Sequence, residues 1–350
     1  MKHIKRESYI TLFLFGIILL TVGCNLDYDG IFYQVSISEE TVEVGQVYLA
    51  GIDSTTLFAY TTDVGMQSYD TVSEEWTEID TSDHISSNIL PSLVSSDGTN
   101  IYFSTRSDEG ENNKIYTFPM NDTDNISVHN SDYDVITFAA PFDLMLTKDS
   151  SDNYYVRRIS NPATLLTTIP SGYEAVKLMA QSDDIFLLNA YTMDDDDEKE
   201  YDYFLYDGSD LLTLTLDSDE YSIRAFYVDE TNDNIAVITS DETVYYDNDF
   251  DIDSDTDFTF VESDDTVSLE TTTVEDSALP VITDYSSALF YIQGDNDYIY
   301  SIDSSTGEVE DVTDDYTVSV SSITIISYLY DDSTSTAYIG TIENGVYELY

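Results

Sequence analysis

The fold is most readily recognised in the stretch "ALFYIQGDNDYIYSIDSSTGEVEDVT", residues 288–313. It holds three short runs rich in Ile, Val, Tyr and Phe, which Gly, Asp, Asn and Ser separate. Such runs predict β-strands, and the short polar breaks between them predict tight turns. Three consecutive antiparallel strands are therefore expected in this part of the chain.

The same arrangement recurs along the chain. Corresponding strands are "TLFAYT" from 56, "NIYFST" from 100, "DLMLTK" from 143, "DIFLLN" from 184, "NIAVIT" from 234, "ALFYIQ" from 288 and "TAYIGT" from 336. Successive units thus begin 41 to 54 residues apart. A four-stranded propeller blade takes about 40 to 50 residues, whereas an immunoglobulin-like module takes about 100.

Further strands flank these pairs, such as "IRAFYV" from 223 and "DFTFV" from 257 in the fifth unit. Four strands in each of seven units predict an all-β protein, a single seven-bladed β-propeller of four-stranded blades. The seventh unit ends at Tyr350 after its third strand, and "IFYQVSI", residues 31–37, precedes the first unit. Pairing these two segments would close the ring and leave no sheet edge at the junction. The alternatives are a β-sandwich or an open solenoid, in which the N-terminal strand pairs elsewhere.

The N-terminus has the layout of an export signal, with a basic start, an apolar run from Tyr9 to Val22, and Gly23 before Cys24. The run is shorter than the roughly 20 residues of a membrane-spanning helix. Thr21 to Cys24 resembles the lipobox of bacterial lipoproteins, which implies a diacylglycerol on the Cys24 sulfur. We therefore expect a signal peptide at 1–23, a lipidated tether at 24–30 and the propeller at 31–350. The alternative is an ordinary secretory signal with an incidental cysteine.

Acidic residues dominate the composition. Removing residues 1–23 leaves 8 Lys and Arg against 69 Asp and Glu, a formal charge of −61. This charge excludes nucleic acid as a partner, because phosphate binding needs clustered Lys and Arg. The acids are spread along the whole chain, which favours adaptation to high salt, as in a halophile, over a dedicated cation-binding surface. We expect a monomer.

One acidic stretch suggests a metal site. "DIDSDTDFTFVE", residues 251–262, places Asp251, Asp253, Asp255, Asp257 and Glu262 at positions 1, 3, 5, 7 and 12 of an EF-hand-like loop. This spacing predicts a surface Ca²⁺ site, although position 6 carries Thr in place of Gly. Since one residue in five is acidic, chance spacing is the alternative. No other cofactor is predicted.

No catalytic residue is assigned. Only His84 and His129 follow the signal, and the G-x-S-x-G pattern of a nucleophile elbow is absent from the sequence. Arg157 and Arg158 form the only basic doublet after the signal.

Three segments resemble known propeller repeats. "YSIDSSTGEVEDVT", residues 300–313, is similar to a quinoprotein-type repeat, and "SYDTVSEEWTEI", residues 68–79, resembles the outer hairpin of a kelch blade. "YIGTIENGVYELY", residues 338–350, is similar to the repeat of sensor-kinase propellers. The double glycine of kelch is missing and Trp76 is the only tryptophan, so the resemblance implies a fold and no active-site residues.

These features predict a lipid-anchored, surface-displayed binding or scaffold module for protein or polysaccharide. Asn25 resembles the residue after the lipidated cysteine in lipoproteins sorted to the outer membrane. The alternatives are a carbohydrate-active enzyme with paired carboxylates and an outer-membrane assembly factor. Acids clustered with aromatics at one mouth of the central channel would favour the enzyme.

Overall fold

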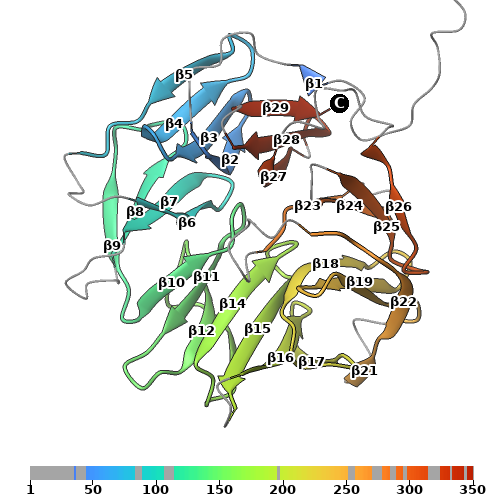
Figure 1. Ribbon diagram of the computed structural model, residues 1–350. Helices are drawn as coiled ribbons and strands as arrows, with labels where there is room; N and C mark the ends of the chain where they lie inside the picture. The colour runs from blue at the N-terminus through green and yellow to red at the C-terminus, as the bar shows by residue number, and fades with distance from the viewer. Residues whose placement is uncertain are drawn as a thin grey trace, which may run out of the picture.

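The computed structural model describes residues 35–36, 45–82, 89–105, 114–194, 198–250, 257–269, 278–283, 289–294, 298–313, 324–331, 333–342 and 345–349. Seven blades of four antiparallel strands surround a central axis (Figure 1). The predicted all-β, seven-bladed propeller is thus confirmed. Within the described ranges, no helix is both long and apolar enough to span a membrane.

The strands of blades one to four are, from the axis outward, β2 (Val47–Asp53), β3 (Thr56–Thr61), β4 (Gly65–Asp70) and β5 (Glu75–Glu78); β6 (Ile89–Ser96), β7 (Asn100–Thr105), β8 (Lys114–Pro119) and β9 (Ser127–Asn130); β10 (Asp134–Phe138), β11 (Leu144–Lys148), β12 (Tyr154–Arg158) and β13 (Leu165–Thr168); β14 (Ala175–Ala180), β15 (Phe186–Met193), β16 (Lys199–Tyr206) and β17 (Leu211–Thr215). Those of blades five to seven are β18 (Ile223–Asp229), β19 (Asn234–Thr239), β20 (Thr243–Asp247) and β22 (Val261–Thr266); β23 (Val281–Thr283), β24 (Leu289–Gln293), β25 (Ile299–Asp303) and β26 (Val309–Asp311); β27 (Ile325–Asp331), β28 (Thr336–Thr341), β29 (Val346–Leu349) and β1 (Val35–Ser36).

The recurrent runs of the sequence are the second strands of the blades. β19 and β28 are buried at every position, because both of their faces pack against a neighbouring blade. A strand buried on both faces has a continuous apolar run in place of an alternating one. The outer strands have the opposite character, and all four residues of β9 are exposed.

The N-terminal strand closes the ring, as predicted. β1 pairs antiparallel with β29, with Val35 opposite Leu349 and Ser36 opposite Glu348 (Figure 1). Blade seven therefore combines the two ends of the chain in one sheet.

Blade five departs from the predicted strand assignment. Residues 257–261 were expected to form its outer strand, but β21 (Asp257–Thr259) pairs in parallel with β17 of blade four. β22, the strand that follows, pairs with β20 and completes blade five. Phe260 lies between the two strands and is buried in the interface of blades four and five. One buried aromatic residue thus separates two strands that belong to different blades.

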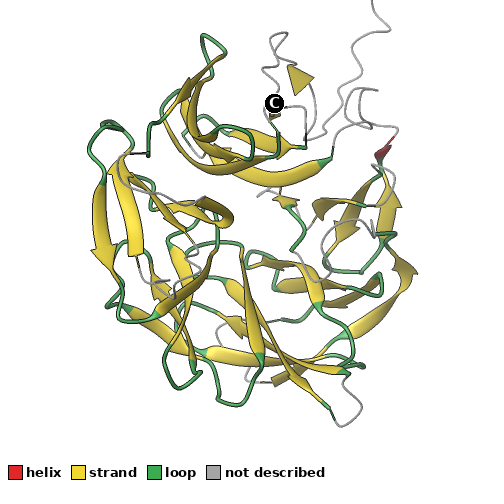
Figure 2. Cartoon of the chain, turned by 60° about the vertical axis from the view of Figure 1, so that its left-hand side comes forward, coloured by secondary structure: helices red, strands yellow, loops and turns green. Residues whose placement is uncertain are grey.

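Figure 2 shows the blades as neighbouring strand layers around the ring. The hydrophobic core consists of seven clusters, one at each interface between neighbouring blades. Phe58, Phe118 and Phe186 are among the fully buried side chains, and burying such a side chain stabilises a fold by about 1.5–3 kcal/mol. Tyrosines contribute to many of these interfaces. The hydroxyl of Tyr154, for example, donates to the carbonyl of Glu174 at 3.0 Å.

Aspartates follow the inner strands. Six of the seven blades have one at the end of the inner strand or within five residues after it: Asp53, Asp97, Asp143, Asp183, Asp229 and Asp331. The corresponding part of blade six, residues 284–288, lies outside the described residues. Because the blades repeat one strand order around one axis, these residues, the mouth aspartates, lie at the same end of the channel.

Candidate functional site

A cavity of about 350 Å³ lies at the centre of the ring. The inner strand of every blade, or the turn beside it, contributes to its wall. Ligand pockets usually measure about 300–1,000 Å³, so the central cavity has the size of a small-molecule site.

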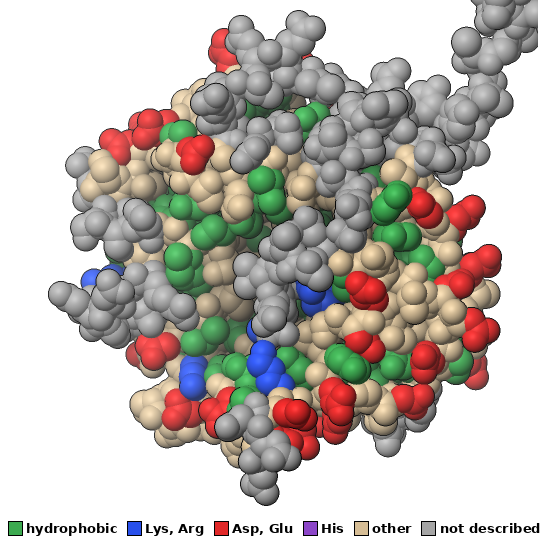
Figure 3. All heavy atoms as spheres, viewed as in Figure 1, with side chains coloured by type: hydrophobic (Ala, Val, Ile, Leu, Met, Phe, Trp, Pro, Cys, Tyr) green, Lys and Arg blue, Asp and Glu red, His purple; other side chains and the backbone are tan. Residues whose placement is uncertain are grey.

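The described part of the cavity wall is uncharged and largely apolar. None of the lining residues that the structure describes is Asp, Glu, Lys, Arg or His, although the chain has 70 acidic residues. Six aromatic side chains contribute to the lining: Tyr48, Phe138, Phe142, Phe226, Tyr328 and Tyr330. On the face drawn in Figure 3, acidic side chains lie mainly near the periphery, whereas hydrophobic side chains and a few Lys or Arg side chains lie nearer the centre.

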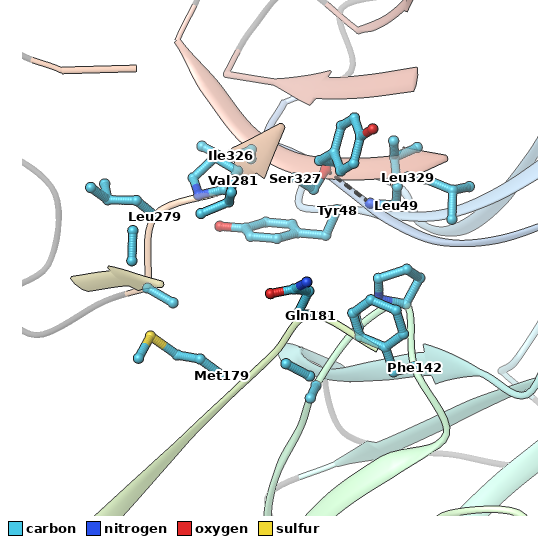
Figure 4. A pocket seen from close by; sticks show the side chains of 18 of the residues that line it. Tyr48, Leu49, Phe142, Met179, Gln181, Leu279, Val281, Ile326, Ser327 and Leu329 are labelled. Carbon is cyan, nitrogen blue, oxygen red and sulfur yellow. Dashed lines mark hydrogen bonds between the residues drawn. The ribbon is translucent and has the colours of Figure 1, made fainter. Parts of the chain in front are cut away.

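Tyr48 of β2 extends into the middle of the cavity (Figure 4). Its hydroxyl donates to Oε1 of Gln46 at 2.8 Å. Burial, and then the neighbouring Tyr60, raises the pKa of the Tyr48 hydroxyl above its ordinary value, so the side chain is neutral at physiological pH.

Two polar side chains of the lining bond to the protein itself. Nε2 of Gln181 donates to the Val228 carbonyl at 2.7 Å, and its Oε1 accepts from the Val228 N–H at 2.8 Å. Oγ of Ser327 donates to the Val47 carbonyl at 2.9 Å and accepts from the Leu49 N–H at 3.1 Å (Figure 4). These bonds join blade four to blade five and blade seven to blade one, and they engage the side-chain oxygens of both residues with the backbone.

A pair of acids does lie close together beside the cavity, at the junction of blades three and four. The Asp143 carboxylate accepts from the backbone N–H and the hydroxyl of Ser160, at 2.7 and 2.5 Å. The Asp143 N–H donates to Asp183 at 2.8 Å, and Arg158 contacts Asp184 at 2.7 Å. Burial raises the pKa of Asp143, against the opposing effect of the Ser160 bonds.

These contacts hold two turns together, and the Asp143 side chain is only 9% exposed. Neither Asp143 nor Asp183 lines the cavity. The carboxylate pair that glycoside hydrolysis requires is therefore not found in the described wall of the channel.

Most of the predicted metal and lipid sites lie outside the described residues, which exclude Cys24, Asp251, Asp253 and Asp255. Asp257 begins β21, and Glu262 is exposed in β22. Because β21 pairs with blade four and β22 with blade five, the two described members do not share one loop. Elsewhere in the described ranges, no three His, Cys, Asp or Glu residues are grouped as metal ligands. Lipidation and Ca²⁺ binding stay predictions.

The basic doublet has a structural role in both of its members. Arg158 contacts the acids of the following blade. The Arg157 guanidinium is buried, lies 3.9 Å from the centre of the Tyr133 ring, and donates through Nη1 to the Pro162 carbonyl at 3.1 Å. His129 is exposed in β9, and His84 lies outside the described residues.

The sequence did not single out the cavity residues. Their only signal is the scarcity of acids in inner-strand segments such as "VITFAA", residues 135–140, and that scarcity is also expected of any buried strand.

Comparison with known proteins gives no relative of established function. No protein family profile matches the chain, and no curated protein does. Among solved structures, a crystal structure of the computationally designed Ika8 protein matches 88% of this chain and 98% of its own, with 12% identity and a TM-score of 0.48. A likeness this distant carries no information about a ligand or partner.

Proposed function

We propose that this protein is a binding module that holds a mainly apolar group in its central cavity. The observation that carries the proposal is that no charged side chain is found among the described residues of the cavity wall, in a chain of formal charge −59. Apolar pockets with few polar groups are the usual form of a ligand site. The propeller fold itself is compatible with a binding or scaffold role, and a fold alone does not define a function.

An apolar group suits the cavity better than a polysaccharide does. Sugar recognition commonly uses amide and charged side chains that bond to hydroxyls, whereas Gln181 already bonds to the backbone and the described lining has no charged side chain. A uronate or sulfated polymer would also be repelled by the acidic surface.

A cavity-filling variant tests the proposal. Ala180 lines the cavity at the end of β14, and Ala180→Trp would place an indole ring in that space. We expect the neutral fluorescent probe N-phenyl-1-naphthylamine to bind the wild-type chain saturably and Ala180→Trp at least about tenfold more weakly.

The matched control is Val72→Trp, which adds the same side chain at a position that is 77% exposed, in the turn between β4 and β5. It should bind the probe as the wild type does. Equal affinity of the wild type and Ala180→Trp would show that the probe does not enter the cavity and would contradict the proposal.

The proposal includes a lipid anchor on Cys24 that holds the disc at the cell envelope, at the outer membrane. Its support is the resemblance of residues 21–24 to a lipobox and the apolar run before it.

A further inference from the structure

We propose that the ligand of the central cavity is an organic cation that lacks N–H donors, such as a quaternary ammonium group. This inference rests on the proposed binding function and names the chemical class that the same cavity takes.

The described wall of the cavity is rich in aromatic side chains. Tyr48 extends into the middle of the cavity, and Phe142 flanks it from the turn between β10 and β11 (Figure 4). Aromatic rings attract cations through the negative potential of their faces, and this attraction strengthens where water is excluded. A site lined by several rings and no formal charge can therefore favour a cation without a salt bridge.

The mouth aspartates create a negative electrostatic potential at one end of the channel. The mouth aspartates lie where the inner strands end. At Asp97 and Asp331, burial raises the pKa, but bonds from backbone and side-chain donors outweigh it and hold the pKa below its ordinary value, so these carboxylates are charged at neutral pH. Low-dielectric walls focus such a field and raise the local concentration of cations.

The polar groups of the wall suit a cation without N–H donors better than other cations. A primary ammonium ion carries three N–H donors, and burying them without acceptors is costly. The side-chain oxygens of Gln181 and Ser327 already accept from the Val228 and Leu49 N–H groups, and the described lining has no carboxylate for such an ion to pair with. Ca²⁺ and Mg²⁺ favour carboxylate ligands, which the described lining lacks. A quaternary ammonium ion has no donors, and its methyl groups suit the apolar lining.

The test compares choline with 3,3-dimethylbutan-1-ol, a neutral molecule of the same shape with carbon in place of nitrogen. Titration calorimetry would use the purified full chain in choline-free buffer, at 0.15 and 1 M NaCl. At 0.15 M NaCl, we expect choline to bind at least about tenfold more tightly than 3,3-dimethylbutan-1-ol. The preference should shrink but persist at 1 M, where the Debye length is about 3 Å and only the aromatic contribution remains.

Two variants of Tyr48 test whether the preference for choline over the neutral isostere comes from the aromatic ring. Tyr48→Leu should weaken choline binding at least about tenfold and leave the neutral isostere nearly unchanged. Tyr48→Phe keeps the ring, loses only the bond to Gln46, and should retain the preference. Tyr298→Leu, at a ring that is 42% exposed beside β25, is the matched control and should behave as the wild type.

Each contrary result has a distinct meaning. Equal binding of choline and its isostere would overturn the cation preference and leave the proposed binding function intact. Binding of neither molecule, while N-phenyl-1-naphthylamine still binds, would overturn the cation proposal alone, and failure of all three to bind would overturn both proposals. If ethanolamine bound as tightly as choline, the requirement for a cation without N–H groups would be overturned. If Tyr48→Leu weakened the binding of choline and of the neutral isostere equally, the Tyr48 ring would contribute packing and no cation preference.

Discussion

At the level of single residues, aspartate performs the turn-forming role that Gly and Pro have in many β-proteins. The chain has 14 Gly and 6 Pro among 350 residues. Oδ1 of Asp70, Asp97 and Asp229 each accepts from the backbone N–H groups two and three residues later. Such bonds fix a turn in the way that an Asx turn does. Part of the acidity therefore has a structural purpose, in addition to the salt adaptation that composition alone predicts.

Asp97 offers a test of this role. Its carboxylate accepts from the N–H groups of Thr99 and Asn100 at 2.9 and 2.7 Å, and from the Tyr102 hydroxyl at 2.8 Å. We expect Asp97→Ala to lower the free energy of unfolding at pH 7 by about 1–2 kcal/mol, since hydrogen bonds to a charged group are lost in a partly exposed turn. Urea denaturation measures this difference.

The decrease in the free energy of unfolding caused by Asp97→Ala should depend on pH, in a direction that the pKa of Asp97 determines. The pKa of Asp97 is lower in the folded state than its ordinary value, so the contribution is fully present above the unfolded pKa near 3.9. It disappears as the pH falls through the lower, folded pKa. The difference between wild type and Asp97→Ala should therefore shrink from pH 7 to pH 3. Asp97→Asn, which keeps an acceptor and cannot ionise, is the control, and a loss that is equal at both pH values would refute the argument.

At the level of elements, β1 is the smallest strand and has the largest effect on connectivity. Among the described residues, Val35 and Ser36 are the two that pair with β29 at its outer edge, and without them that edge of blade seven would be open. An open strand edge is also a site for association between chains.

Deleting residues 31–37 should therefore lower the melting temperature by several degrees and promote association, because blade seven would retain three strands. Deleting residues 25–30, which precede the strand, is the control and should leave the melting temperature nearly unchanged. Differential scanning calorimetry and light scattering measure both effects. A melting temperature unaffected by the loss of residues 31–37 would show that the closure contributes nothing to stability.

The strands were predictable because most of the second and third strands are buried on both faces, and this burial leaves long apolar runs such as "NIAVIT" in β19. β21 was misassigned because an outer strand carries little side-chain information about which neighbouring edge it pairs with. The cavity was not predictable either. Tyr48 and Gln181 lie 133 residues apart in the chain, and only the closed ring brings them to the same space.

At the level of the whole molecule, the cations are confined to one side of the disc. All eight Lys and Arg residues after the signal lie between residues 106 and 224, within blades two to five. Blades six, seven and one have none. The field around the disc is therefore uneven, and the half that contains both chain ends is the more uniformly acidic.

The predicted anchor, Cys24, precedes β1 of blade seven by eleven residues in the sequence. An acidic surface gains nothing from anionic lipid headgroups, so the acyl chains would have to supply the attachment, at about 0.8 kcal/mol per buried CH₂. Cys24→Ser should therefore move the protein from the detergent phase to the aqueous phase in a Triton X-114 partition. Asn25→Ser is the control and should stay in the detergent phase, and unchanged partitioning of Cys24→Ser would rule out the anchor.

The pairing of Val35 with Leu349 also sets the order in which the molecule can be completed. Blades one to six can form their sheets from consecutive segments as the ribosome releases them, because each uses only neighbouring stretches of chain. Blade seven must wait until β29 has been made, while β1, made long before it, remains without its partner. Contacts between segments so distant in sequence form slowly. Of the seven blades, this one is therefore the last that can acquire all four of its strands during synthesis.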